Sequence, residues 1–167
     1  MDADHVAGDL ESVLFSEAEI AARVTTLAQE LGRDYAGRDP VLIGVLGGAA
    51  TFTVDLARAF EDQLEITWMA IRSYTTRNRA SGSVRLLKDL DLDIAGRDVI
   101  IVDGVIDTGL TMSWLITNLA QRGPASVESA VVVGEEQICV RLVTDHPVIE
   151  PPPVSYTHLT LPTILLV

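Results

Sequence analysis

The stretch that decides the fold is Val99-Ile100-Ile101-Val102-Asp103-Gly104-Val105-Ile106-Asp107-Thr108-Gly109-Leu110-Thr111. Its first four residues are all apolar and β-branched, which is typical of a strand buried on both faces of a parallel sheet. Asp103 to Gly109 is predicted to form a turn, and Leu110 to Arg122 has the length and amphipathic pattern of a helix that Gly123-Pro124 ends. The stretch therefore predicts a strand, a turn and a helix in succession.

A second unit of the same kind precedes it. Val41 to Leu46 is another unbroken apolar run, and Gly47-Gly48 follows at once. The next residues predict a helix whose apolar face carries Phe52, Leu56, Ala59 and Phe60. Both glycine-bearing turns come directly after a buried strand.

The remaining elements complete an alternating pattern. A capping box at Ser16 to Glu19 begins a helix that should run to about Tyr35. Further strands are expected at Ile66 to Ile71, Val84 to Leu87 and Val127 to Val133, and Arg72 to Ser83 reads as a polar, mobile loop. We expect an α/β domain with a mainly parallel sheet flanked by helices, and ligands beyond the carboxyl ends of its strands.

Composition limits the function. The 167 residues carry 12 Lys+Arg and 24 Asp+Glu, a net charge of −12 that disfavours nucleic-acid and anionic membrane partners. Cys139 is the single cysteine, which excludes an internal disulfide, and we expect it to be a small strand residue. No apolar run reaches membrane-spanning length and the start, Met1 to His5, does not resemble a signal peptide, so we expect a cytoplasmic protein.

The turn after Val102 has the chemistry of a phosphate site. Backbone amides, the hydroxyls of Thr108 and Thr111, and the dipole of the following helix all favour an anion. Asp103 and Asp107 beside it need hydroxyl groups or a divalent cation as partners. A sugar phosphate with Mg²⁺ satisfies both demands.

With these residues the chain resembles the type I phosphoribosyltransferases, whose phosphoribosyl-diphosphate signature has the pattern of Val99 to Thr111. Gly44 to Ala49, followed by Phe52 to Ala59, resembles the diphosphate loop and helix of the hypoxanthine-guanine members. Ser73-Tyr74 and Ser81 to Ile94 are similar to the mobile catalytic loop and hairpin of the bacterial enzymes. The resemblance covers roughly Leu10 to Val133 and implies the type I phosphoribosyltransferase fold.

The resemblance also implies a reaction. Members transfer 5-phosphoribosyl from phosphoribosyl diphosphate to a purine base, here hypoxanthine or guanine, and form IMP or GMP and pyrophosphate with Mg²⁺ as cofactor. This is purine salvage by a pentosyltransferase, and its relatives form homo-oligomers, dimers or tetramers.

The resemblance assigns roles to individual residues. Asp107 would be the catalytic base, Asp103 would face the ribose hydroxyls and Mg²⁺, and Ser73-Tyr74 would close over the site. Thr108, Gly109 and Thr111 would hold the 5′-phosphate, and Leu46-Gly47 would be a strained peptide whose amide meets the diphosphate. The full binding set comprises Leu46, Gly47, Gly48, Asp103, Gly104, Val105, Ile106, Asp107, Thr108, Gly109, Leu110 and Thr111.

The chain departs from the family pattern at several positions. Gly104 stands in place of a second acid, Gly47 and Gly134 in place of two lysines, and Ile149 near the place of the aromatic residue that stacks on the base. The one lysine, Lys88, lies in the hairpin, and Arg72, Arg77, Arg79 and Arg85 could contact diphosphate or be merely solvated. An alternative is therefore a degenerate paralogue that binds phosphoribosyl diphosphate or a nucleotide without turnover. A dinucleotide turn at Gly44 to Gly48 is disfavoured because its spacing is not Gly-x-Gly-x-x-Gly.

The C-terminal segment does not fit the pattern. Val154 to Thr163 is uncharged and looks like the translation of a transposon-type sequencing adapter, since GTC TCT TAT ACA CAT CTG ACG CTG CCG ACG encodes it in order. We expect residues 1–153 to be a phosphoribosyltransferase domain that is incomplete at its C-terminus, and residues 154–167 to be foreign.

Overall fold

In the computed structural model, which describes residues 15–74, 83–106, 109–134 and 137–143, a six-stranded sheet has the order β3-β2-β1-β4-β5-β6. β2, β1, β4 and β5 are parallel, and the outer strands β3 and β6 pair with them antiparallel. The strands are β1 (Val41–Leu46), β2 (Glu65–Tyr74), β3 (Ser83–Lys88), β4 (Asp98–Val105), β5 (Ser126–Gly134) and β6 (Gln137–Val143). The helices are α1 (Glu17–Asp34), α2 (Ala50–Ala59) and α3 (Leu110–Ala120). The predicted α/β class is confirmed.

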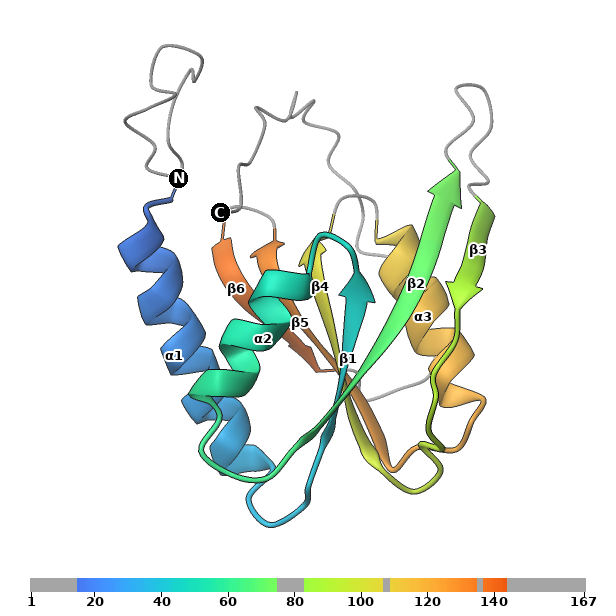
Figure 1. The fold of residues 1–167 in the computed structure, drawn as a ribbon, viewed down its shortest axis with the longest axis horizontal. Coiled ribbons are helices and arrows are strands. Elements are labelled where there is room, and N and C mark those ends of the chain that lie inside the picture. The colour runs from blue at the N-terminus through green and yellow to red at the C-terminus, as the bar shows by residue number, and fades with distance from the viewer. Residues whose placement is uncertain (1–14, 75–82, 107–108, 135–136, 144–167) are drawn as a thin grey trace.

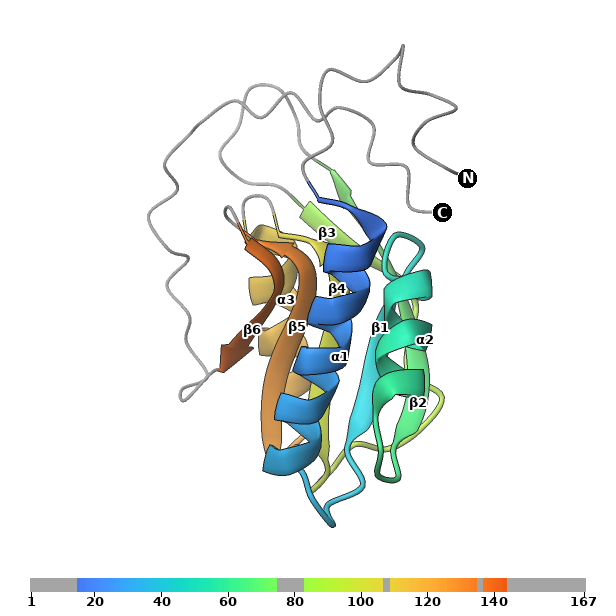
Figure 2. The same ribbon diagram turned by 90° about the vertical axis from the view of Figure 1, so that its left-hand side faces the viewer.

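Helices cover the sheet on both sides (Figures 1 and 2). α1 and α2 pack on one face with Leu42, Ile100 and Val102, whereas α3 packs on the other with Ile43 and Ile101. The central strands β1 and β4 are therefore buried on both faces, which is why their sequences are apolar without alternation. Among the described residues, none of the helices has the length and apolarity to cross a membrane.

The first helix begins and ends as its sequence predicts. The Ser16 hydroxyl accepts a hydrogen bond from the Glu19 backbone N–H, and the Glu19 carboxylate accepts one from the Ser16 N–H at 2.8 Å. Tyr35 caps the other end, and its hydroxyl donates to the buried Glu128 carboxylate of β5 at 2.6 Å. This buried bond fixes the C-terminal end of α1 on the sheet, a contact that sequence spacing does not reveal.

Two predicted boundaries were wrong, both because sheet pairing extends a strand into a polar segment. β4 continues to Val105 instead of ending at Val102, since Asp103 pairs with Val131. β2 continues through Arg72 to Tyr74, where the sequence suggested a loop, because it forms an antiparallel ladder with β3. Residues 75–82 of the predicted mobile loop lie outside the described residues. Cys139 lies in β6, as expected for a strand residue.

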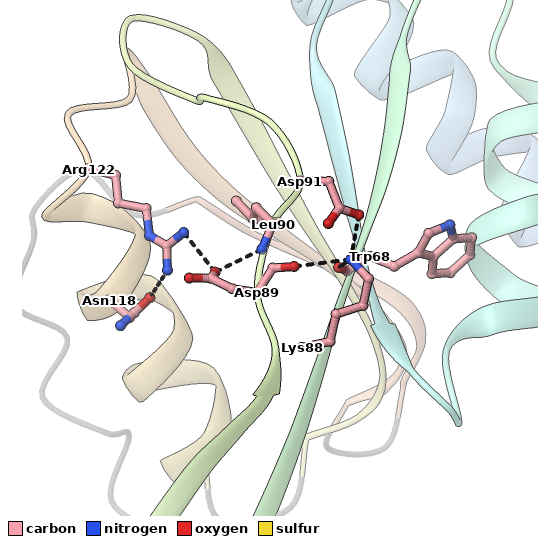
Figure 3. Close-up of polar contacts among 7 residues, drawn as sticks. All are labelled: Trp68, Lys88, Asp89, Leu90, Asp91, Asn118 and Arg122. Atoms are coloured by element: carbon pink, nitrogen blue, oxygen red, sulfur yellow. Dashed lines mark hydrogen bonds and ion pairs between the residues drawn. The ribbon is translucent and has the colours of Figure 1, made fainter.

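The lone lysine has a structural role (Figure 3). The Lys88 ammonium donates to the Trp68 carbonyl at 3.1 Å, to the Asp89 carbonyl at 3.0 Å and to the Asp91 carboxylate at 2.6 Å. These bonds use its three N–H donors. Lys88 therefore connects the C-terminal end of β3 to β2.

A second set of contacts in Figure 3 connects the segment after β3 to the C-terminal end of α3. The Arg122 guanidinium lies 2.8 Å from the Asp89 carboxylate and donates to Asn118 at 2.8 Å. The hydrogen bond from Arg122 lowers the pKa of Asp89 below its ordinary value. Asp89 and Asp91, the carboxylate partners of Arg122 and Lys88, lie in the segment after β3 and not in the glycine-bearing turns.

The neighbours of Gly44 in β1 leave no room for a larger side chain at this position. It is buried, and an added Cβ would lie 2.4 Å from the Trp68 ring and 2.9 Å from the Thr53 hydroxyl. Trp68 pairs with Gly44 across the sheet and is half-buried.

We expect Gly44→Ala to lower the free energy of unfolding by about 1–3 kcal/mol, because the added methyl group must displace the indole ring or the Thr53 hydroxyl. Urea denaturation followed by circular dichroism measures the change. Gly32→Ala is the matched control: its Cβ meets nothing within 4 Å, and it should stabilise helix α1 by about 0.5–1 kcal/mol. Equal stability of Gly44→Ala and the wild type would contradict the steric assignment.

Candidate functional site

The two glycine-bearing turns meet at one edge of the sheet. β1 and β4 are neighbouring parallel strands, so the loop after Leu46 and the turn after Val105 leave the sheet at the same end. The first turn also lies next to the end of β4: a Cβ on the buried Gly104 would lie 3.4 Å from the carbonyl carbon of Gly48.

The first turn exposes its backbone. Leu46, Gly47 and Gly48 are all exposed, and the Leu46-Gly47 peptide is cis. The helix α2 then begins at Ala49, an N-cap residue that has no side-chain oxygen. Its first-turn amides thus lack the side-chain cap that most helices have.

The second turn is built in the same way. Helix α3 begins at Gly109, which adopts φ +71° and makes no side-chain capping bond. Leu110 and Thr111 form the first helical turn. Both helices that follow these turns are therefore uncapped by their N-cap residues, whereas α1 has a complete capping box.

One carboxylate of this edge lies among the described residues. Asp103 is half-buried, and its carboxylate accepts a hydrogen bond from the Gly104 N–H at 2.7 Å. Burial raises the pKa of Asp103 above its ordinary value, although that hydrogen bond opposes the shift. A cation or hydroxyl donor placed next to Asp103 would stabilise its charged form.

Most of the predicted site residues come together here. Those that lie on the two turns, or on the strand and helix ends that hold them, are Leu46, Gly47, Gly48, Asp103, Gly104, Val105, Ile106, Gly109, Leu110 and Thr111. Asp107 and Thr108 lie outside the described residues. Ser73 and Tyr74 are the last residues of β2, which lies on the opposite side of β1 from β4 and the turn that follows β4.

The N-terminus of α2 is a second amide-rich helix end, which the sequence pattern alone did not single out. The signal was present, because Ala49 and Ala50 occupy a helix start where Ser, Thr, Asp or Asn is usual. A helix start without a capping residue, directly after a glycine turn, leaves its amides to a ligand or to water.

Asp103 is the one carboxylate that the described residues of the two turns and their strands offer to Mg²⁺. Within the described parts of the chain, no group of three or more His, Cys, Asp or Glu could hold a metal ion. Mg²⁺ is nevertheless often held by one or two carboxylates together with the phosphates of a substrate and water. Asp103 could supply one carboxylate, and Gly104 supplies none.

Comparison with known proteins identifies the family. The phosphoribosyl transferase domain matches residues 13–150. The chain belongs to the phosphoribosyltransferase family. The predicted resemblance is thereby confirmed, and the fold is that of the hypoxanthine phosphoribosyltransferases described next.

Three proteins illustrate the similarity. The hypoxanthine-guanine phosphoribosyltransferase of Mycobacterium bovis is 48% identical over 126 residues, which cover 72% of this chain and 62% of that protein. The crystal structure of a hypoxanthine phosphoribosyltransferase from Staphylococcus aureus has a TM-score of 0.74 at 30% identity, over 80% of this chain and 72% of the other. The Trypanosoma cruzi hypoxanthine phosphoribosyltransferase in complex with the product IMP has a TM-score of 0.68 at 36% identity, over 75% and 71%. The chain thus spans less than two thirds of the length of the Mycobacterium relative.

Asp103→Asn should raise the melting temperature of the unliganded protein at neutral pH. The raised pKa means that the folded state binds the proton more tightly than the unfolded state, so Asp103 lowers stability as pH rises above 3.8. Asparagine carries no charge and keeps the acceptor for the Gly104 N–H. The gain should therefore shrink as the pH falls toward 3.8.

Thermal unfolding over a pH series measures this effect, with Asp55→Asn on the exposed side of α2 as the control. That exposed substitution should give no comparable gain. An Asp103→Asn melting temperature at or below that of the wild type at neutral pH would contradict the burial assignment.

Proposed function

We propose that the chain is a purine salvage enzyme that transfers 5-phosphoribosyl from phosphoribosyl diphosphate to hypoxanthine or guanine, giving IMP or GMP and pyrophosphate. The observation that carries the proposal is the pair of uncapped helix starts, at Ala49 and Gly109, on one sheet edge beside the half-buried carboxylate of Asp103. Phosphoribosyl diphosphate has phosphate groups at two ends of a ribose. Two separate amide clusters with a carboxylate between them match that charge distribution.

The two turns would divide the substrate between them. Thr108, Gly109 and Thr111 at the start of α3 would hold the 5′-phosphate, with the helix dipole favouring its charge. Leu46, Gly47 and Gly48 would offer backbone N–H groups to the diphosphate. A net charge of −12 disfavours anions in general, so binding through backbone amides suits this chain.

Asp103 would orient the ribose by accepting hydrogen bonds from its hydroxyl groups, and it would be the protein's carboxylate toward Mg²⁺. When bound, Mg²⁺ neutralises charge on the departing diphosphate. Gly104 lies next to Gly48, so the two anion sites would be neighbours at the ends of β1 and β4. A defined spacing of the two sites would favour one geometry of the bound substrate.

Asp107 would accept the proton from the imidazole nitrogen of the purine as the new bond forms. Ser73 and Tyr74 would then close over the site and exclude water, which would otherwise hydrolyse the substrate.

A degenerate binding protein is the second candidate, favoured by Gly104 and Gly134. Glycine removes the second acid beside Asp103, and Gly134 ends β5 where a lysine would contact the purine in the family pattern. Lys88 cannot substitute for that lysine, because all three of its N–H donors are engaged at the C-terminal end of β3. Phosphate and ribose binding would then persist without efficient turnover.

We also propose that the protein acts in the cytoplasm as a homo-oligomer, and that residues 154–167 are translated adapter sequence. The family match ends at residue 150, before this segment. Genomic DNA read past Pro153 should therefore lack codons for Val154 to Thr163. Recovery of those codons from the genome would refute the adapter assignment.

The activity is tested by mixing the protein with Mg²⁺, phosphoribosyl diphosphate and hypoxanthine or guanine, and measuring pyrophosphate and nucleotide. Asp107→Asn should reduce kcat by about 10²–10⁴-fold while the affinity for phosphoribosyl diphosphate changes little, since it removes a proton acceptor and no phosphate contact. A parallel assay with residues 154–167 replaced by the genomic continuation controls for the foreign segment.

The outcomes separate the two candidates. Nucleotide formation supports the enzyme, whereas thermal protection by phosphoribosyl diphosphate without pyrophosphate release supports the binding protein. Equal losses of turnover and affinity in Asp107→Asn would show that Asp107 binds substrate rather than accepting its proton.

A further inference from the structure

Two exposed arginines lie directly opposite one another on the outer strands β2 and β3. Arg72 of β2 pairs with Arg85 of β3 across the antiparallel ladder. Side chains in directly opposed positions of such a ladder have Cβ atoms about 4.5–5.5 Å apart, and like charges there destabilise the pairing. Within the described parts of the chain, neither arginine forms an ion pair with a carboxylate.

The other described cations each have a local source of stabilisation. Those that form an ion pair with a carboxylate are Arg23, Arg38, Lys88, Arg97 and Arg122. Arg33 and Arg58 lie in the last turns of α1 and α2, where the helix dipole favours a positive charge. Arg72 and Arg85 have neither, in a chain with 24 Asp+Glu and only 12 Lys+Arg. Their pairing with each other therefore indicates a ligand that carries negative charge.

Both arginine side chains point to the side of the sheet on which α2 packs. Their neighbours Ile71 and Leu86 pack with the core residues of α3, on the other side. Successive side chains of a strand alternate between the two faces, so Arg72 and Arg85 point away from α3. An anion bound by this pair would therefore lie on the side of the turn that begins α2, and not on the side of the turn that begins α3.

The strand register places the pair level with the turn that begins α2. Leu46, the last residue of β1, pairs with Ala70 of the neighbouring parallel strand β2. Arg72 lies two residues beyond Ala70, about 6–7 Å farther along the strand. In Figure 1 the end of β2 and the start of β3 lie side by side, at the same end of the molecule as the end of β1. Since Gly47 and Gly48 have no side chains, this turn supplies no cation of its own.

We propose that Arg72 and Arg85 bind the diphosphate group of phosphoribosyl diphosphate, an inference that rests on the proposed function. The two guanidinium groups would contact the diphosphate from the β2–β3 side, while the backbone amides of Gly47 and Gly48 would contact it from the other. A guanidinium group donates paired hydrogen bonds to phosphate oxygens, and a diphosphate carries enough charge to neutralise both arginines. Binding would thus remove the repulsion between them.

The position of the pair on the α2 side makes it selective for one end of the substrate. The 5′-phosphate would bind at the start of α3, on the opposite face, where neither arginine points. Loss of either arginine should therefore weaken binding of the diphosphate and leave binding of the 5′-phosphate end unchanged. This difference separates a direct contact from a general effect of positive charge on anion binding.

Isothermal titration calorimetry of the full chain with inorganic pyrophosphate, in the presence of Mg²⁺, tests the proposal. Arg72→Gln and Arg85→Gln should each raise the Kd for pyrophosphate by about tenfold, because each removes a charged hydrogen-bond donor. The Kd for ribose 5-phosphate should change by less than about twofold. Arg58→Gln, at the far end of α2, removes the same charge from an exposed position and is the matched control that should leave both Kd values unchanged.

The outcomes separate this inference from the proposed function. If Arg72→Gln and Arg85→Gln bind pyrophosphate as tightly as Arg58→Gln does, the arginine site is wrong and the proposed function is unaffected. The same holds if the wild type binds ribose 5-phosphate but not pyrophosphate. A wild type that binds neither ligand would overturn both.

Thermal unfolding of the unliganded protein gives an independent readout. Arg72→Gln should raise the melting temperature by about 1–4 °C at low salt, because it removes the repulsion from Arg85. Arg72→Gln/Arg85→Gln should add little to that gain, since either single substitution already removes the repulsion. A lower melting temperature for Arg72→Gln would show that this arginine stabilises the fold through another contact and would overturn its assignment to the ligand.

Discussion

The parallel pairing of β1 with β4 is the constraint on which the rest of the structure depends. Gly44 lies opposite Val102, so both strands end at the same edge and both following turns open there. Each strand is buried on two faces, which requires a helix layer on each side of the sheet. The site is thus a consequence of strand pairing, and its two halves come from segments about sixty residues apart.

The two ends of the parallel strands differ in their side-chain contacts. At the edge where the parallel strands begin, charged side chains connect the elements: Arg97 lies 2.9 Å from Glu65, and Arg122 contacts Asp89. At the opposite edge, Ala49 and Gly109 begin helices without a side-chain cap. Leaving helix amides uncapped lowers stability but makes them available to an anion. Helix α1, by contrast, has a complete capping box.

Glycine has a different consequence at each of three described positions. Gly44 makes room for the Trp68 ring, and Gly109 adopts a left-handed conformation at the start of α3. Gly104 lies next to Gly48, where an added Cβ would be 3.4 Å from the carbonyl carbon, at the near limit of ordinary contact. Its main consequence is chemical, because the acid of the family pattern is absent and fewer carboxylates are available to Mg²⁺.

The amino-acid sequence by itself determined the order of the elements from α1 to β5, the class of fold, the capping box and the two glycine-bearing turns. These follow from local patterns: uninterrupted apolar runs, glycine after a strand, and a helix period after the turn. The tertiary structure alone decided the lengths of β2 and β4, because their polar ends are held by partners distant in sequence such as Val131 and Arg85. It alone decided that Tyr35 bonds Glu128, that Lys88 is structural, and that Gly48 meets Gly104. Each of these depends on which segments become neighbours in space, and no periodicity within a single segment encodes that.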